Sequence, residues 1–334
     1  MAAVSPLLSV SDLVVEFASR RGRVRALDGV SFELGRGEIL GVVGESGAGK
    51  SLTGAAVIGL IEPPGRVASG SIALDGQRID GLSERALRRI RGKRIGAVFQ
   101  DPLTSLNPLY TVGEQLVETI RTHLPLDAAA ARERAIGLLR DTGIPAPEAR
   151  IDQYPHQFSG GMRQRVVIAL ALAAEPELVI ADEPTTALDV SIQAQIIGLL
   201  KRLARERGVA VLLITHDMGV IAETCDRVAV MYAGRVVEIG PVREVIHAPA
   251  HPYTAGLMAA IPRLDAVGHG ERLAQIDGAM PRPGAWPAGC SFHPRCPHAQ
   301  PRCAEGDRPE LRSVGATRAA CWLAPIVRIE EAAA

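Results

Sequence analysis

A glycine-rich segment followed by a lysine and a serine is the first feature of the sequence that could do chemistry. It follows a predicted strand and opens a predicted helix that begins near Lys50. Its glycines let backbone N–H groups surround phosphate oxygens, and a helix N-terminus favours negative charge. Lys50 can reach the β and γ phosphates of a nucleotide, and Ser51 can bind Mg²⁺. A chance glycine-rich turn is the alternative to a phosphate loop. The predicted binding residues are Gly44, Ser46, Gly47, Ala48, Gly49, Lys50, Ser51 and Leu52.

Two adjacent carboxylates, Asp182 and Glu183, end a second predicted strand, residues 178–181. In the same sheet as a phosphate loop, Asp182 would hold Mg²⁺ and Glu183 would polarise the water that attacks the γ phosphate. Acidic pairs at strand ends also serve as plain helix caps. The neighbouring phosphate loop favours the catalytic interpretation.

A third segment, residues 158–165 with the sequence Phe-Ser-Gly-Gly-Met-Arg-Gln-Arg, starts another predicted helix. The Ser159 hydroxyl and the amides of Gly160 and Gly161 at a helix start could form a second anion site. One ATP cannot lie on both anion sites of a monomer. A helix N-cap with glycines for tight packing is the alternative.

Four short apolar runs are typical of buried parallel strands: residues 39–43, 95–99, 178–181 and 209–215. Ligands of open α/β sheets collect beyond the carboxyl ends of the strands. Those ends carry polar residues or a glycine, so we predict one shared site there. The residues are Gly44, Gln100, Asp182 with Glu183, and His216.

The spacing of apolar residues becomes helical between Pro102 and Gln157, where residues 112–122 and 128–142 are predicted helices. This predicts a helical subdomain inserted into the α/β core. From about residue 246, proline, glycine, arginine and cysteine dominate and the periodicity fades. A loop-rich tail that needs an external staple is therefore expected.

Residues 158–165 resemble the signature of ABC ATPases, although Phe158 and Met162 depart from the family's usual Leu and Gln. Gln100, Asp189 after Ala187-Leu188, and His216 match the family's Q-loop, D-loop and switch histidine, in family order. The resemblance implies a RecA-like P-loop α/β core with an N-terminal antiparallel β subdomain, an inserted α-helical subdomain and a small loop-rich C-terminal domain. The expected boundaries are 1–101 for the first part of the core with the β subdomain, 102–158 for the helical insert, 159–245 for the second part of the core, and 246–334 for the tail.

The same resemblance assigns roles within the site. Two ATPase domains would pair head to tail, so that Ser159, Gly160, Gly161 and Asp189 meet nucleotide held by the partner's phosphate loop. Catalysis would rest on Glu183, His216 and Gln100, and Mg²⁺ would be held by Ser51, Gln100 and Asp182. Phe17, about 27 positions before Gly44, matches the family's adenine-stacking ring. A core strand residue is the alternative for Phe17, and a core or capping histidine is the alternative for His216.

Two further segments resemble the oligopeptide and dipeptide importer branch: the Q-loop form at residues 100–108 and His251-Pro252-Tyr253-Thr254. The resemblance implies coupling of ATP hydrolysis to uptake of di- or oligopeptides. The implied partners are two permease subunits, a second homologous ATPase and an extracytoplasmic substrate-binding protein. The segment after Gln100 would receive a permease coupling helix. Nickel or another small solute remains an alternative cargo.

Four cysteines crowd into the tail, with five, six and seventeen residues between them. Because the chain is expected in a reducing compartment, a metal site is the natural interpretation. The tight pair usual for zinc is absent, and a tail of this kind resembles cluster-bearing dipeptide-type subunits, which implies a [4Fe–4S] cluster. Zinc, free thiols and assembly disulfides stay open, and His293 or His298 could substitute as ligands. Cys225 is expected to be a core thiol. The four tail cysteines are Cys290, Cys296, Cys303 and Cys321.

Composition limits the remaining possibilities. Acidic and basic residues balance at 37 each in 334 residues, so no global field argues for nucleic acid or an anionic membrane. No apolar run reaches the ~20 residues needed to span a bilayer, so the chain is expected to stay in the cytosol and to contact a membrane only through partners. The resemblance to importer ATPases implies a peripheral protein at the cytoplasmic face of the inner membrane. A soluble ABC ATPase of DNA repair or translation would carry a coiled coil, a zinc module or a fused second ATPase domain. The sequence shows no such insertion or fusion, so this class of protein is disfavoured. A non-catalytic partner subunit is disfavoured by Lys50, Glu183 and His216, and a regulatory ATP switch would turn over without a permease.

Overall fold

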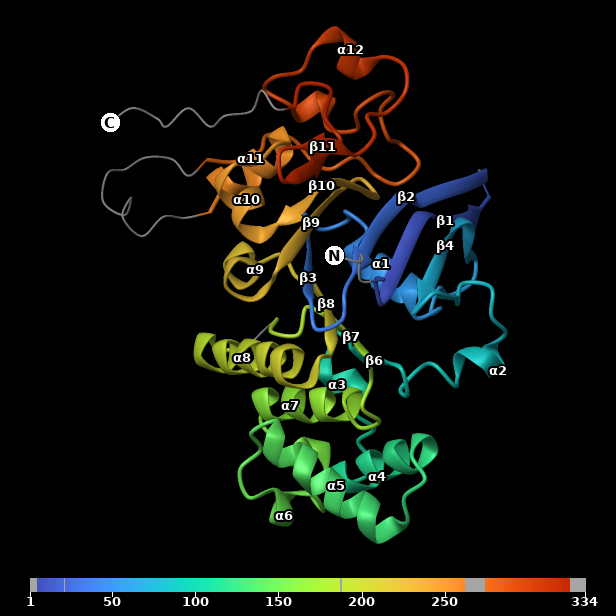
Figure 1. The fold of residues 1–334 in the computed structure, drawn as a ribbon, viewed down its shortest axis with the longest axis vertical. Coiled ribbons are helices and arrows are strands. Elements are labelled where there is room, and N and C mark those ends of the chain that lie inside the picture. Colours follow the sequence, from blue (N-terminus) through green and yellow to red (C-terminus); the bar gives the residue numbers. More distant parts are fainter. Residues whose placement is uncertain (1–4, 21, 187, 262–273, 325–334) are drawn as a thin grey trace, which may run out of the picture. The chain divides into compact units, whose positions relative to one another are not determined.

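The computed structural model describes residues 5–20, 22–186, 188–261 and 274–324 (Figure 1). Ala187, before the predicted D-loop aspartate, and parts of the predicted tail lie outside the described residues. The chain forms two compact units. The first unit consists of residues 5–8, 34–39 and 73–214, and the second of residues 9–33, 40–72 and 215 onward.

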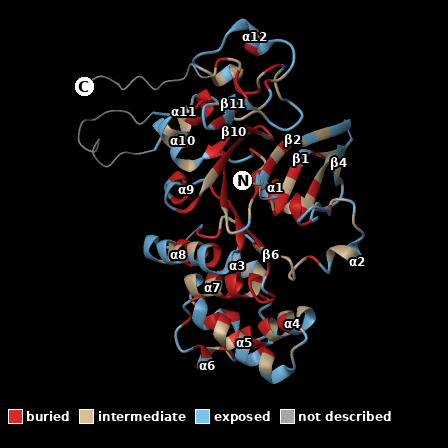
Figure 2. Cartoon of the chain, in the orientation of Figure 1, coloured by how far each residue is buried: buried red, intermediate tan, exposed pale blue. Residues whose placement is uncertain are grey.

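Three parallel strands form the sheet of the first unit: β6 (Ile95–Val98), β7 (Leu178–Asp182) and β8 (Ala210–Ile214). They confirm three of the predicted strands, with ends shifted by one residue. Their apolar residues are almost all buried (Figure 2). Since parallel strands end at the same edge, the residues after β6 and β7 lie close together. That edge carries Gln100, Asp182 and Glu183.

Most of the other elements of the first unit are helices, and the two predicted ones are confirmed as α4 (Val112–His123) and α5 (Ala128–Asp141). A capping box starts α4: the Glu114 N–H donates to Thr111 Oγ1 at 3.1 Å, and the Thr111 N–H donates to Glu114 Oε2 at 2.7 Å. Both helices pack on α7 (Gly160–Ala171). The others are α2 (Glu84–Leu87), α3 (Pro102–Ser105), α6 (Pro147–Arg150), the 3₁₀ turn η1 (Pro155–Gln157) and α8 (Val190–Arg207).

Strand β3 (Ile39–Val43) is buried and pairs in parallel with β9 (Arg227–Tyr232) in the second unit. It is followed by the predicted phosphate loop and α1 (Lys50–Val57), as the sequence predicts. Strand β9 pairs with β10 (Arg235–Pro241) in antiparallel fashion. A second sheet contains β1 (Leu8–Ser19), β2 (Gly22–Leu34), β4 (Gly65–Leu74) and β5 (Gln77–Arg78).

The tail is more regular than its composition predicts. Its two short strands, β11 (Arg312–Val314) and β12 (Thr317–Ala319), pair with each other, and β12 also pairs with β10. The tail therefore extends the sheet that holds the phosphate loop. The helices here are α9 (Met218–Thr224), α10 (Val242–His247), α11 (Pro252–Ala259), the 3₁₀ turn η3 (His293–Arg295) and α12 (Pro301–Ala304). Among the described residues, no helix is both long and apolar enough to cross a membrane.

Candidate functional site

The lysine of the predicted phosphate loop is buried and donates hydrogen bonds to the backbone of the loop itself. Lys50 is only 7% exposed, and its Nζ donates to the carbonyl oxygens of Gly44 at 2.7 Å and Glu45 at 3.1 Å. Gly44 has a φ of 150°, and a Cβ there would lie 2.2 Å from the Met231 carbonyl oxygen. A side chain at position 44 is therefore excluded, and the backbone can keep the tight curve that an anion cradle needs.

The loop also presents polar groups outward. Ser46, Gly47 and Ser51 are exposed, Leu52 is partly exposed, and Ala48 is buried. Gly49 precedes α1 in a left-handed conformation with no side-chain cap. A helix N-terminus directly after a glycine-rich loop is a favourable place for a phosphate group. The nucleotide-binding role of these residues stays a prediction.

The structure brings Gln100 and Glu183 together at the end of the first unit's sheet. Gln100 Nε2 donates to Glu183 Oε2 at 3.0 Å, and Thr186 Oγ1 donates to the same oxygen at 2.9 Å. Glu183 has a φ of +47°, which is unusual for a residue with a side chain, and its N–H donates to the Ile214 carbonyl at 2.8 Å. Asp182 is the residue before it and ends β7. Two donors therefore orient one carboxylate while leaving it partly exposed.

The Ser-Gly-Gly segment begins α7, and the capping alternative holds for its serine. Ser159 Oγ accepts from the Met162 N–H at 3.4 Å. Gly161 has a packing reason to be glycine, because a Cβ there would lie 2.8 Å from Ile192 Cγ2. Among the described residues Gly160 has no such reason, since a Cβ there would meet none of their atoms within 4 Å. Ser159 and Gly160 are both exposed, so an external ligand can reach them.

His216 and Asp189 are both exposed, in the second and the first unit respectively. The alternative roles for His216 are wrong: it is not a core residue, and Asp217 caps α9 by accepting the N–H groups of Gly219 and Val220 at 2.8 and 3.2 Å. Asp189 precedes α8 without a side-chain capping bond. Both side chains therefore remain candidates for the roles that the sequence assigns.

Phe17 is partly exposed on β1, and its ring packs against Gly65, where a Cβ would lie 2.6 Å from Phe17 Cε1. It is not a fully buried core residue. Gln100, Asp182, Glu183, Ser159 and Asp189 lie in the first unit, and the phosphate loop, Phe17 and His216 lie in the second. One site shared by all of them stays a prediction.

The four tail cysteines are thiols without disulfides, and they interact electrostatically with one another. Burial raises the pKa of Cys290, Cys296 and Cys321, that of Cys296 to about 11, and the charges of neighbouring cysteines raise them further. The Cys290 N–H donates to the Cys303 carbonyl at 2.9 Å. Even so, the described residues contain no group of three or more His, Cys, Asp or Glu side chains arranged to hold a metal ion.

The remaining expectations concern the fifth cysteine, Cys225, and the two tail histidines near the cysteines. Cys225 is buried, and burial raises its pKa, as expected of a core thiol. His293 is turned toward the backbone, with Nδ1 at 2.9 Å from the Cys290 carbonyl oxygen. His298 is exposed. These positions give no direct support for histidine ligands.

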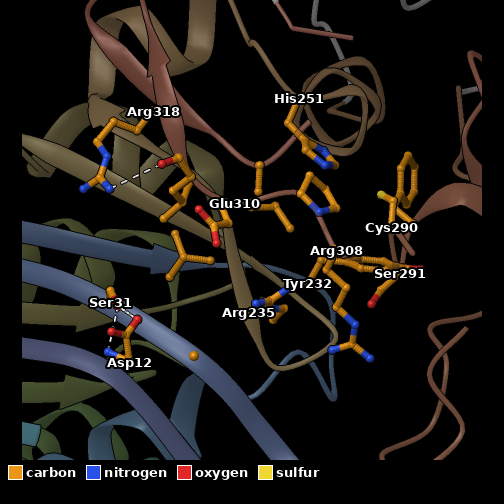
Figure 3. Close-up of a pocket in the computed structure, with 17 residues that line it drawn as sticks. Asp12, Ser31, Tyr232, Arg235, His251, Cys290, Ser291, Arg308, Glu310 and Arg318 are labelled. Atoms are coloured by element: carbon orange, nitrogen blue, oxygen red, sulfur yellow. Dashed lines mark hydrogen bonds between the residues drawn. The ribbon is translucent and has the colours of Figure 1, made fainter. Parts of the chain in front are cut away.

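Sequence reasoning missed a cavity of about 370 Å³ in the second unit (Figure 3). Its lining comes from β1, β2, β9, β10 and the tail, which no local pattern connects. Ser291 Oγ is buried there and has no hydrogen-bond partner in the part of the chain that the structure describes. His251, also in the lining, caps α11 by accepting the Tyr253 N–H at 3.0 Å. Burial lowers the pKa of His251 to about 3, so the ring is neutral.

Comparison with known proteins decides the family. Residues 27–186 match the ABC transporter family, and residues 237–303 match the oligopeptide/dipeptide transporter C-terminal region. The oligopeptide transport ATP-binding protein OppD of Bacillus subtilis is 48% identical over 97% of this chain and 90% of its own length. The chain belongs to the ABC transporter ATP-binding proteins of the oligopeptide/dipeptide group. The dipeptide transport ATP-binding protein DppD of Escherichia coli is 48% identical over 89% of this chain and 90% of its own length.

Solved structures of ABC cassettes agree with this assignment. The cassette MJ0796, described as dimeric in a post-hydrolysis state with ADP and Pi, shares 29% identity with this ABC ATPase. The TM-score is 0.64, over 71% of this chain and 99% of MJ0796. The predicted family, the ABC ATPase fold and the ATPase activity class are thereby confirmed.

Proposed function

We propose that this ABC ATPase binds ATP with Mg²⁺ on residues 44–52 and hydrolyses it to drive uptake of di- or oligopeptides through partner permeases. The observation that carries the proposal is the double match, to the ABC transporter family and to the oligopeptide/dipeptide C-terminal region, along one chain. Relatives aligned over most of their length are named for oligopeptide and dipeptide transport.

The donor set fits Mg²⁺, which prefers oxygen ligands: the Ser51 hydroxyl, the Gln100 amide oxygen and the Asp182 carboxylate. Bound Mg²⁺ would neutralise charge on the β and γ phosphates. Glu183 would accept the proton of the attacking water at the oxygen that Gln100 and Thr186 orient. His216 would contact the γ phosphate, Lys50 would bind the β and γ phosphates, and Phe17 would stack on adenine.

The active site would be completed by a second, homologous ATPase. Ser159, Gly160, Gly161 and Asp189 would face nucleotide on the partner's phosphate loop. The exposure of Ser159 and Gly160 supports a ligand there. The dimeric MJ0796 cassette provides a precedent for pairing in this fold. We retain the four-part division at residues 1–101, 102–158, 159–245 and 246–334 as the domain proposal.

Two permeases and an extracytoplasmic substrate-binding protein would complete the importer, with this chain at the cytoplasmic face of the inner membrane. The segment after the Q-loop offers apolar surface for a permease coupling helix. Leu109 is 79% exposed there, and the adjacent Tyr110 is also exposed. Exposed apolar side chains that lie close together are typical of protein contacts.

Hydrolysis should therefore depend on the permeases and on Leu109. Adding the permeases, the second ATPase, the binding protein and a tripeptide should raise the ATPase rate of the wild-type chain at least about tenfold. Leu109→Ser should remove most of this stimulation, because a coupling helix loses its apolar contact, and leave the ATP dissociation constant unchanged. Leu60→Ser, which changes another exposed leucine, is the control. A full rate without permeases would instead favour a non-transport ABC ATPase.

Nickel or another small solute is the alternative cargo, because the ATPase subunit is not expected to touch the cargo. The names of the relatives favour peptides. Uptake of a labelled tripeptide by the assembled importer, measured with excess unlabelled tripeptide or with excess Ni²⁺, separates the two cargoes. Inhibition by the tripeptide alone indicates a peptide importer, and inhibition by Ni²⁺ indicates a nickel importer.

We also propose that Cys290, Cys296, Cys303 and Cys321 hold a [4Fe–4S] cluster, with zinc as the alternative. The electrostatic interaction among these four thiols supports this. The raised pKa values of Cys290, Cys296 and Cys321 keep these three thiols protonated in the metal-free chain, so metal binding would release protons. A bound cluster would staple a tail whose described strands are only three residues long.

Metal analysis tests the cluster. The anaerobically purified chain should contain about four iron atoms and absorb visible light as a [4Fe–4S] protein does. Cys303→Ala should lose the iron, because a thiolate ligand is removed, and Cys225→Ala should keep it. Zinc in place of iron, or no metal in the wild-type chain, would contradict the cluster.

A further inference from the structure

One arginine of the cysteine-containing tail forms an ion pair with the phosphate loop. Arg295 lies between Cys290 and Cys296 in the sequence, in the 3₁₀ turn η3. Its side chain is 7% exposed, and Nη1 donates to both carboxylate oxygens of Glu45, each at 3.1 Å. Glu45 is the second residue of the phosphate loop and is 250 positions away in the chain. The contact lies wholly within the second unit.

The remaining donors of Arg295 are fixed as well. Its Nε donates to the Asp277 carbonyl at 2.8 Å, and Nη2 donates to the Ile276 carbonyl at 3.2 Å. Nη1 is also 3.4 Å from the Tyr232 hydroxyl. All three guanidinium nitrogens therefore have partners, which holds the side chain in one orientation. A lysine at this position could supply charge at one point only.

A second contact holds the backbone of the same glutamate. The Glu45 N–H donates to the hydroxyl of Tyr253 at 2.9 Å. Tyr253 is fully buried, and its ring lies 4.7 Å from that of Tyr232 and 5.4 Å from that of Phe292. Tyr232, Cys290 and His251 all line the cavity shown in Figure 3. The tail thus fixes both the main chain and the side chain of Glu45.

The negative charge of Glu45 would oppose phosphate binding, and Arg295 neutralises this charge. A carboxylate within an anion-binding loop repels phosphate groups, and its side chain is only 30% exposed, so water screens it incompletely. The carbonyl oxygen of Glu45 also accepts from Lys50 Nζ at 3.1 Å. A displaced Glu45 would therefore disturb the lysine that is expected to bind the phosphates.

We propose that Arg295 is a positioning residue for ATP: it neutralises Glu45 and fixes the phosphate loop, so that the cysteine-containing tail sets the nucleotide affinity. This inference rests on the proposed binding of ATP to residues 44–52. Its consequence is that a change in the loop between Cys290 and Cys296 reaches the phosphate loop through one guanidinium group.

The test is a double-mutant cycle on the full chain with the ATP dissociation constant as its readout. Arg295→Met should raise that constant about tenfold, within the usual range for coupling between sites. Glu45→Gln alone should bind ATP at least as tightly as the wild type, because the repelling charge is gone. The double variant should return to within about threefold of the wild type, since the unpaired carboxylate is absent.

Controls separate this inference from the proposed function. Arg302→Met changes another tail arginine, which donates to the Trp322 carbonyl, and should leave the constant unchanged. Lys50→Ala should weaken ATP binding; if it does not, the proposed function fails. If Lys50→Ala weakens binding while Arg295→Met matches the wild type, only the inference is overturned.

Two further outcomes would overturn the charge argument. If Arg295→Met and the double variant weaken ATP binding equally, Arg295 acts only as a structural support. Weaker ATP binding by Glu45→Gln would show that the carboxylate does not oppose phosphate. This last measurement remains decisive even if Arg295→Met does not fold, because it leaves Arg295 in place.

Discussion

Replacing Glu183 with glutamine is expected to slow ATP hydrolysis by about 10²–10⁴-fold, the usual contribution of a general base, while ATP binding stays within about twofold of the wild type. Glutamine has the same shape and its oxygen can still accept from Gln100 and Thr186. It cannot take a proton from the attacking water. The loss should therefore appear in the catalytic rate and not in affinity.

The measurement is single-turnover hydrolysis by the chain assembled with its second ATPase, beside equilibrium binding of ATP. Because ATP binds but is not consumed, the variant should also accumulate as a closed pair that elutes earlier in size-exclusion chromatography. Glu206→Gln makes the same chemical change at an exposed position of α8 and should hydrolyse ATP normally. Undiminished turnover by Glu183→Gln would remove this residue from the mechanism.

Replacing Lys50 with alanine is expected to weaken ATP binding by about two orders of magnitude, because a charge-assisted contact to the phosphates is lost. The loop itself should also loosen, since Lys50 bonds to two of its carbonyl oxygens. The effect should therefore appear in the dissociation constant, in contrast to Glu183→Gln.

Titration with a fluorescent ATP analogue checks this. Lys201→Ala, on α8 in the first unit, is the matched control and should bind as the wild type does. Thermal unfolding of both variants shows whether the chain still folds. An unchanged dissociation constant in a folded Lys50→Ala chain would contradict the role assigned to this lysine.

Local patterns predicted the elements that carry the chemistry. Strand β3 and the start of α1 lie where the apolar run and the glycine-rich loop indicate, because both signals are contained in neighbouring residues. The edge with Gln100 and Glu183 followed from the rule that ligands collect at the ends of parallel strands. The direct hydrogen bond between these two side chains could not be predicted. The orientation of the Glu183 side chain depends on a left-handed backbone conformation that no sequence motif indicates.

Other features required the folded chain. Strands β11 and β12 are three residues long, too short to show an alternating pattern; β12 forms by pairing with β10, and β11 by pairing with β12. The link between Arg295 and Glu45 joins positions 250 residues apart. The cap on α9 could have been found, because an aspartate before a helix is a common N-cap and Asp217 stands beside His216.

Uptake of a labelled tripeptide into proteoliposomes tests the central claim most directly. The vesicles would contain this chain, its second ATPase and both permeases, with the binding protein and peptide on the opposite side of the membrane from ATP. We predict accumulation of peptide that needs ATP and that is abolished when this chain carries Glu183→Gln. ATP hydrolysis at full rate without permeases, together with no peptide uptake, would contradict the account.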